Sequence, residues 1–174
     1  LPKEQKIIFG PDKNLGDYVM KKTGRDLVLW NGACMVHELF SYDKINELRE
    51  QFPQAKFIAH PECEQHILES ADYIGSTSGL LKYTIENESD TFIVATESGI
   101  IYQMQKASPH KTFIPAPPNN TCACNDCPYM KLNTLEKVYN CLKYDQPEVD
   151  LPMDLIDRAR KPIERMLEIS ARYG

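Results

Sequence analysis

The sequence predicts an α/β fold built from three-layer α/β/α domains with short parallel sheets. Short apolar runs alternate along the 174-residue chain with longer amphipathic segments of helical spacing. Strands that alternate with helices favour a parallel sheet that is covered by helices on both faces. Apolar residues make up 42% of the chain and charged residues 26%, which is typical of a globular protein with a buried core.

Five short runs in which apolar and β-branched side chains gather are predicted to be strands. They are residues 6–9, 26–30, 56–59, 91–95 and 112–114. The first and third run directly into polar turns that contain proline, where a strand has to end.

The segments between these runs have the spacing of amphipathic helices. The predicted helices are residues 14–22, 42–52, 63–70, a segment after 75–79 that ends near 87, 97–107, 132–143 and 152–173. Gly24 is expected to end the first helix, since glycine is preferred just beyond a helix terminus. Pro162 is expected to kink or split the last helix, because proline lacks the helical hydrogen-bond donor.

Charge and hydropathy argue against two classes of partner. The chain carries 25 acidic and 20 basic side chains, a formal net charge of −5, and has no basic block. Nonspecific nucleic-acid binding is therefore not expected, and no stretch approaches the ~18 continuous apolar residues of a membrane span. The chain starts without an initiator Met and without a secretion signal. We expect a fragment or processed product of a cytoplasmic protein, whose thiols stay reduced.

A faint internal repeat relates residues 7–34 to the segment that starts at residue 92. Each unit consists of a strand, an acidic residue at a helix start, a helix, a second strand and then a cysteine. Ligands of α/β proteins bind at the carboxyl ends of strands, so the repeat places two cysteines at equivalent ligand-binding positions. The acid–cysteine pairs are Asp12 with Cys34 and Glu97 with Cys127.

The strongest chemical signal is the motif Cys122-x-Cys124-x-x-Cys127-Pro128. Cysteine-rich loops followed by proline occur around iron–sulfur clusters, because thiolates bind iron. The spacing matches no standard zinc ribbon, since the sequence lacks a second Cys-x-x-Cys pair beside it. Spacing alone leaves three interpretations open: a metal or cluster site, a redox disulfide, or incidental thiols.

The other three cysteines stand apart in the sequence. Cys34 lies on a predicted turn, where a lone cysteine usually has only a packing role. Because it is equivalent to Cys127 in the repeat, we consider a ligand role equally well supported. Cys63 opens a predicted helix, whose N-terminus can activate a thiol, although we favour a structural role. Cys141 shares a helix face with leucine and valine side chains, so we expect it in the core.

Two groups of proton-exchanging side chains follow predicted strands. His37 lies three residues after Cys34, and His60-Pro61-Glu62 ends the third predicted strand. Histidine and glutamate at the ligand-binding edge of a sheet are suited to acid–base chemistry. The alternative is a solvated turn, since strand-to-helix turns often carry polar residues.

The segment 75–79, Gly-Ser-Thr-Ser-Gly, precedes a predicted helix. Free N–H groups and hydroxyls at a helix N-terminus attract phosphate or carboxylate. The commoner use of Ser76 or Thr77 at this place is simple N-capping, and both interpretations stay open. His66 and His110 are expected at the surface.

Five segments of the chain form an ordered set of motifs. They are Pro11-Asp12-Lys13-Asn14-Leu15-Gly16, Trp30-Asn31-Gly32-Ala33-Cys34-Met35-Val36-His37, His60-Pro61-Glu62-Cys63, Gly75-Ser76-Thr77-Ser78 and Cys127-Pro128-Tyr129-Met130-Lys131-Leu132-Asn133-Thr134-Leu135. In this order and spacing, the chain resembles the quinolinate synthase A family of NAD biosynthesis. The likeness covers nearly the whole chain.

The resemblance implies three similar α/β domains around a pseudo-threefold axis. On this basis residues 1–51 are the C-terminal half of the middle domain, and residues 52–174 are the third domain with its C-terminal helix. The first domain is absent from this chain. The isolated chain is then expected to be inactive, because residues of the absent domain complete the pocket.

The resemblance also implies a [4Fe–4S] cluster to which each domain contributes one cysteine. Cys34 and Cys127 would be two of these ligands, and the third is not in this chain. Three thiolates leave one iron open, and an open iron can act as a Lewis acid. Cys122 and Cys124 lie in a segment that varies within the family and are a candidate redox pair.

The family's reaction condenses iminoaspartate with dihydroxyacetone phosphate to quinolinate, with loss of phosphate and two waters. By resemblance, His60 and Glu62 bind substrate and move protons, and His37 is a second candidate acid or base. The remaining substrate-binding residues implied are Pro61, Ser76 and Thr77. The enzyme that oxidises aspartate is the implied upstream partner.

Two rival hypotheses follow from the residues. The first is a zinc-binding interaction module, in which Cys122, Cys124, Cys127 and one distant residue hold Zn²⁺. The second is a subunit whose other half is supplied by a separate chain. Colour and metal content distinguish the zinc module from an iron–sulfur synthase. Co-purification of a second chain distinguishes the partner-dependent subunit.

Overall fold

The computed structural model describes residues 2–119 and 125–173 of the chain. It divides into two compact units, Leu1–Lys131 and Leu132–Gly174.

A four-stranded parallel sheet forms the centre of the first unit. Its spatial order is β4-β3-β5-β6, and each adjacent pair runs parallel. The strands are β3 (Lys56–Ala59), β4 (Tyr73–Ile74), β5 (Thr91–Ala95) and β6 (Thr112–Pro115). Every connection between paired strands is therefore a crossover, as parallel pairing requires.

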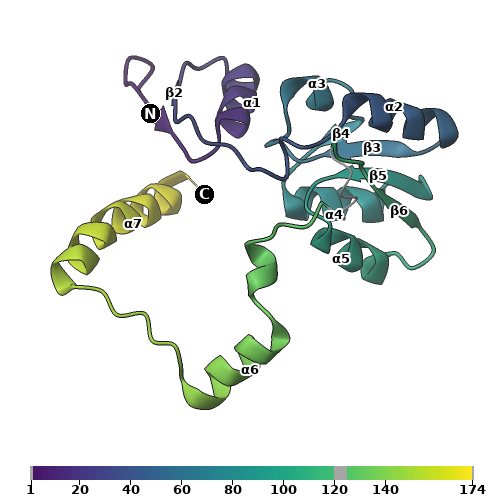
Figure 1. The fold of residues 1–174 in the computed structure, drawn as a ribbon. Helices are drawn as coiled ribbons and strands as arrows, with labels where there is room; N and C mark the ends of the chain where they lie inside the picture. Colours follow the sequence, from purple (N-terminus) through teal and green to yellow (C-terminus); the bar gives the residue numbers. More distant parts are fainter. Residues whose placement is uncertain (1, 120–124, 174) are drawn as a thin grey trace. The chain divides into compact units, whose positions relative to one another are not determined.

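Helices cover both faces of this sheet. Helices α2 (Tyr42–Gln51) and α3 (Gln65–Leu68) lie on one face, and α4 (Thr77–Glu86) and α5 (Gly99–Ala107) lie on the other (Figure 1). Alternate residues of the strands enter two separate cores. The first core includes Phe40, Ile45, Phe57, Ala59, Ile67, Ile93 and Ala95, and the second includes Ile58, Leu80, Phe92, Val94, Met104 and Phe113. This arrangement confirms the predicted three-layer α/β/α fold.

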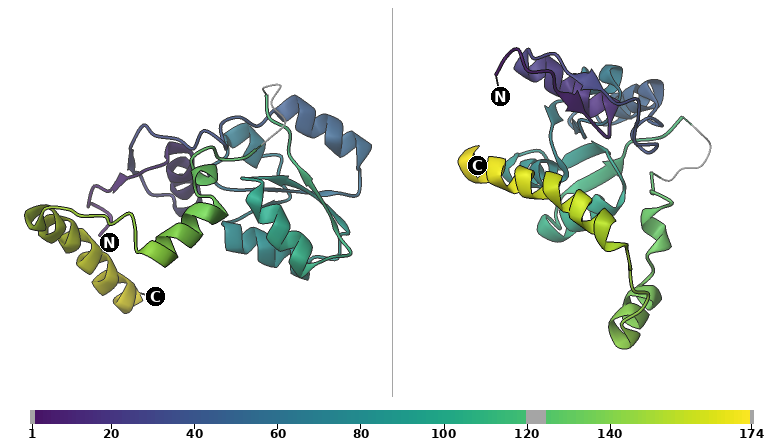
Figure 2. Two further views of the ribbon diagram at one scale, coloured as in Figure 1. Left: turned by 60° about the horizontal axis from the view of Figure 1, so that its bottom comes forward. Right: turned by 90° about the vertical axis from the view of Figure 1, so that its left-hand side faces the viewer.

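A smaller layer precedes the central sheet. Strands β1 (Ile8–Phe9) and β2 (Val28–Leu29) pair in parallel, and α1 (Lys13–Thr23) lies against them (Figure 2). Gly24 has a left-handed φ of 65° and donates its N–H to Met20 O, so it ends α1 as predicted.

Close approach of α1 to this strand pair depends on Gly16. A Cβ at this position would lie 2.4 Å from Leu29 Cδ2 and 2.9 Å from Phe9 Cδ1. Gly16→Ala is therefore expected to lower the free energy of unfolding by about 1–3 kcal/mol through overpacking. Gly10→Ala is the matched control, because its Cβ would meet Trp30 Cβ at an ordinary 3.5 Å. Urea unfolding measures both variants, and equal midpoints would contradict the packing argument.

The second unit contains α6 (Leu135–Tyr144) and α7 (Met153–Tyr173), and the short 3₁₀ turn Met130–Leu132 leads into it. No residue of α6 is buried, and Cys141 is exposed. The prediction that Cys141 belongs to the core is wrong, because helical spacing marks an apolar face without showing whether another element covers it. Helix α7 continues through Pro162, so proline does not split it.

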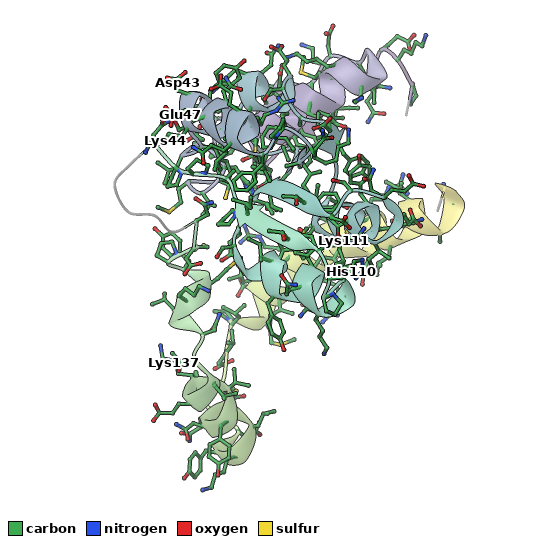
Figure 3. All side chains as sticks on the ribbon, turned by 90° about the vertical axis from the view of Figure 1, so that its right-hand side faces the viewer. Asp43, Lys44, Glu47, His110, Lys111 and Lys137 are labelled. Carbon is green, nitrogen blue, oxygen red and sulfur yellow. The ribbon has the colours of Figure 1, made fainter. Side chains whose placement is uncertain are left out.

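The surface histidines are where the sequence predicted them. His66 and His110 are both exposed, and His110 follows α5 beside Lys111 (Figure 3). Lys111 itself is buried and donates to the carbonyls of Thr84 and Asn87 at the end of α4. Its charge thus satisfies carbonyl groups that a helix C-terminus leaves free.

None of the described helices combines the length and apolar content that crossing a bilayer requires. The predicted division at residues 51 and 52 stays a prediction. Helix α2, which precedes that division, packs on the central sheet through Ile45.

Candidate active site

The carboxyl ends of β3, β4 and β5 lie at one edge of the central sheet. The N–H of His60 donates to Ala95 O at 3.0 Å, and the N–H of Gly75 donates to Ala59 O at 3.2 Å. His60, Gly75 and Thr96 each follow one of these strands. The edge is the usual ligand-binding position of an open α/β sheet.

A loop after β2 brings two further side chains to this edge. His37 Nε2 lies 3.0 Å from Thr96 Oγ1, although 59 residues separate them. The His37 and His60 rings stack with centroids 4.7 Å apart and planes 15° apart. His37 Nδ1 lies 3.0 Å from Glu62 Oε2. The predicted residues His37, His60 and Glu62 therefore form one cluster.

Cys34 joins this cluster through its thiol. The ligand atoms of Cys34, His37 and Glu62 all lie within 4.8 Å of one another. Thiolate, imidazole and carboxylate together form a donor set for a transition-metal ion. A pocket opens beside them, lined by Pro11, Asp12, Trp30, Gly32, Ala33, Cys34 and Glu62.

The start of α1 holds the two loops of the site. Asp12 Oδ1 accepts the N–H of Leu15 at 2.8 Å and thereby caps α1, while Oδ2 accepts the N–H of Cys34 at 2.8 Å. Asn14 Nδ2 donates to Glu62 O at 3.2 Å. One helix terminus thus fixes both the Cys34 loop and the Glu62 loop.

Hydrogen bonding assigns the tautomer of His60. The backbone N–H of Glu62 donates to His60 Nδ1 at 3.4 Å, so Nδ1 acts as an acceptor and the ring proton resides on Nε2. Burial lowers the pKa of His60 by disfavouring the charged ring. His60 is consequently a neutral imidazole near pH 7 that can donate a hydrogen bond from Nε2.

His37 is the most deeply buried titratable group of the cluster, at 6% exposure. Burial, followed by the neighbouring His60, lowers the pKa of His37 to about 4. Its Nδ1 faces Glu62 without a well-directed hydrogen bond, and among the described residues it is a buried polar atom left unsatisfied. A bound molecule or ion would complete it.

Glu62 titrates in the opposite direction. Burial, followed by the negative charge of Asp12, raises the pKa of the Glu62 carboxyl. A carboxyl with a raised pKa beside neutral imidazoles is a pattern found at sites of proton transfer.

Acid is expected to destabilise the protein through His37. The unfolded chain takes up the proton near pH 6.5, whereas the folded ring resists protonation until about pH 4. The free energy of unfolding contributed by His37 therefore falls as pH drops through this window, by roughly 3 kcal/mol in total. Urea unfolding of metal-free protein at several pH values should show a shallower fall for His37→Asn. His66→Asn, at an exposed position, should show the same fall of unfolding free energy with pH as wild type. If His37→Asn also shows the wild-type fall, the expectation is contradicted.

Two other cysteines occupy distinct environments. Cys63 is fully buried, its Sγ–H donates to Ala95 O at 3.4 Å, and burial raises the pKa of its thiol. This supports the structural role favoured for Cys63. Cys127 is half-buried, and its N–H donates to Glu97 Oε1 at 3.4 Å. Cys122 and Cys124 lie outside the described residues.

Ser76 and Thr77 stand at the N-terminus of α4. Ser76 is the N-cap and accepts the N–H of Gly79 at 3.2 Å. Both side chains are exposed, and no hydrogen bond in the described chain joins them to His37, His60 or Glu62. Capping by Ser76 is thus observed, and anion binding stays a prediction.

Sequence reasoning missed Thr96 as a partner of His37, and it treated Asp12 only as a helix start. The repeat carried a signal for Asp12, since it aligned Asp12 with Glu97 and Cys34 with Cys127. No comparable signal existed for Thr96, which is one polar residue after a strand.

Comparisons with known proteins identify relatives of this chain. A family model described as quinolinate synthetase A protein matches residues 1–168. The chain is 60% identical over 170 residues to a quinolinate synthase of Microcystis aeruginosa and 60% identical over 170 residues to one of Gloeothece citriformis; each match covers 98% of this chain and 53% of the relative. It is 57% identical over 171 residues to a quinolinate synthase of Thermosynechococcus vestitus, covering 98% of this chain and 54% of that relative.

The chain spans about half the length of the curated relatives it matches. Within that half, the likeness extends across all five motifs that the sequence presents in order. The match over residues 1–168 leaves only the last six residues outside the family model. The chain belongs to the quinolinate synthetase A family.

Proposed function

We propose that the protein is a quinolinate synthase that condenses iminoaspartate with dihydroxyacetone phosphate in NAD biosynthesis. The observation that carries the proposal is the cluster of Cys34, His37, His60 and Glu62 at the carboxyl edge of the sheet. The names of the relatives supply the reaction class.

The residues of the chain fit a [4Fe–4S] cluster. Cys34 and Cys127 are free, half-buried thiols, each in a loop that follows the second strand of a parallel pair. Thiolates are the usual ligands of such clusters. The unsatisfied Nδ1 of His37 beside Cys34 also indicates a site built around a further group. When bound, a cluster with an open iron would supply Lewis acidity toward substrate oxygen atoms.

The reaction needs proton transfers that this chain can perform. Condensation removes protons from carbon, and each lost water requires a proton delivered to a hydroxyl. Glu62, ionised above its raised pKa, is proposed as the base. His60, with its proton on Nε2, is proposed to donate a hydrogen bond to a departing hydroxyl, and Glu62 is proposed to deliver to that hydroxyl the proton it has taken up. His37, held by Thr96, is proposed to line the pocket as a second acid or base.

Substrate binding is proposed at the start of α4. Both substrates are anions, and the first N–H groups of a helix attract carboxylate or phosphate. The hydroxyls of Ser76 and Thr77 are exposed at this terminus, and the N–H of Gly75 donates to Ala59 O at the end of the strand that precedes His60. Pro61, which is buried, is proposed to shape the turn between His60 and Glu62.

The proposed domain organisation completes the site. Residues 1–51 would belong to a middle domain and 52–174 to a third domain, with a further domain supplying the third cluster cysteine. Iminoaspartate is reactive in water, so an enzyme that oxidises aspartate is the proposed partner upstream. Residues 1–174 alone are expected to form no quinolinate, because the pocket would lack that further domain.

The test uses the complete gene product, expressed and purified without oxygen. A brown protein with about four iron atoms per chain that converts both substrates to quinolinate supports the proposal. A colourless protein that holds zinc and makes no quinolinate would instead favour the zinc-binding module. Quinolinate formation by residues 1–174 alone would contradict the proposed role of the further domain.

A further inference from the structure

One carboxylate oxygen of Asp12 accepts a hydrogen bond from the Cys34 loop. Asp12 is only 3% exposed, and its Oδ2 accepts the N–H of Cys34 at 2.8 Å while its Oδ1 caps α1 through Leu15. A serine at this position would be sufficient to cap the helix. The second oxygen of aspartate is needed only for the cysteine.

Glu97 repeats this arrangement with Cys127. Its Oε1 accepts the N–H of Cys127 at 3.4 Å, and its Oε2 accepts the N–H of Gly99, the first residue of α5, at 2.7 Å. Ser98 occupies the N-cap position of α5, yet its side chain makes no capping hydrogen bond. Glu97 therefore serves the helix start and the cysteine loop together, as Asp12 does.

The two pairs also occupy equivalent places in the topology. Asp12 follows β1 and Cys34 follows its parallel partner β2, while Glu97 follows β5 and Cys127 follows its parallel partner β6. In both cases one carboxylate joins a helix N-terminus to the main chain of a cysteine 22 to 30 residues later. The internal repeat of the sequence thus has a physical counterpart in a shared hydrogen-bonding device.

We propose that Asp12 and Glu97 are positioning residues for the two cluster cysteines, which each holds through its amide N–H. This deepens the proposed function and rests on it. Each carboxylate fixes the cysteine main chain before the cluster binds. Each also occupies an N–H that would otherwise be free to donate to the thiolate sulfur.

The device has two expected consequences for a bound cluster. Fixing the loops slows cluster loss, since outer partners of metal ligands are typically worth 10–100-fold in metal affinity. Hydrogen bonds to cluster sulfur and nearby charge both set the reduction potential. A free amide donor stabilises the more negative reduced cluster, and a nearby carboxylate destabilises it. Removing either carboxylate should therefore raise the potential.

The test compares variants of the complete gene product loaded anaerobically. In Asp12→Ser the serine side chain can still cap α1 but is too short to reach the N–H of Cys34. Asp12→Ala removes both the capping bond to Leu15 and the bond to Cys34. Asp17→Asn is the matched control on the same helix, because half-exposed Asp17 pairs only with Lys21 in the described chain. Glu97→Gln, with Glu86→Gln as its exposed control, tests the second pair.

Three measurements decide the outcome: the rate of iron release to a chelator, the reduction potential, and urea unfolding of the cluster-free protein. Asp12→Ser and Glu97→Gln are expected to release iron roughly ten-fold faster and to shift the potential upward. Asp12→Ser should unfold at a urea concentration between those of wild type and Asp12→Ala, because serine keeps the helix cap and loses only the bond to Cys34. The two control variants should match wild type in every measurement.

Wild-type release rates and potentials in Asp12→Ser and Glu97→Gln would overturn the inference. So would a faster release that is matched by the two control variants. A wild-type protein that takes up no cluster would instead overturn the proposed function itself. Iron content of wild type therefore separates the two failures.

Discussion

Replacing Cys34 or Cys127 by serine is expected to abolish the proposed iron–sulfur cluster of the complete gene product. A serine hydroxyl is a much poorer iron ligand than a thiolate, and the loss of one of the three proposed protein ligands would leave too few. Both variants should be colourless, lack iron and form no quinolinate. Iron content and absorbance after anaerobic reconstitution measure the effect.

Cys141→Ser is the matched control for this experiment. Cys141 is exposed on α6, whose residues are not buried, so its replacement should leave colour, iron content and activity unchanged. Full iron content in Cys34→Ser or Cys127→Ser would contradict the ligand assignment. Loss of iron in Cys141→Ser would require a different set of cysteines.

Glu62→Gln is expected to lower turnover by roughly 10²–10⁴-fold, which is the usual contribution of a general acid or base. Glutamine keeps the size of the side chain but cannot accept the proton. The cluster and the fold should remain, since the Glu62 carbonyl still accepts from Asn14. Quinolinate formation under saturating substrate, with iron content measured in parallel, tests this expectation.

The pH dependence of activity gives this prediction a second readout. A base must be ionised, so wild-type turnover should fall as pH drops through the raised pKa of Glu62, which lies above the ordinary value of 4.5. Glu62→Gln should lack this acid limb. Glu64→Gln is the control, because half-exposed Glu64 pairs with His66 at 3.9 Å and is not part of the cluster. An intact acid limb in Glu62→Gln would assign the base to another group.

Strands buried on both faces were predicted with their correct bounds. After their first residues, Lys56 and Thr91, the runs at 56–59 and 91–95 are continuously apolar and buried, because helices cover both sides of the central sheet. The two-residue strand β4 (Tyr73–Ile74) was missed, since two residues carry no periodicity. The smaller strand pair was predicted too long, at 6–9 and 26–30 against two paired residues in each strand.

The ends of a helix were predicted correctly where capping residues and apolar spacing agreed. The burial of a helical residue was predicted wrongly for Cys141. Helix α1 begins after its cap Asp12 and ends at Gly24 as its chemistry requires. Cys141 was placed in the core from the same kind of periodicity and is exposed. A hydrophobic stripe is a local property of the sequence, whereas burial depends on the element that packs against it.

By itself, the sequence determined the α/β class, the order of the motifs and the candidate residues for the proposed chemistry. These properties follow from local periodicity and from residue types in a fixed order. Only the tertiary structure decided that His37 meets Thr96 and Glu62, and that Asp12 and Glu97 each hold a cysteine N–H. Such contacts join residues 22 to 59 positions apart, and parallel crossovers bring them together at one end of the strands.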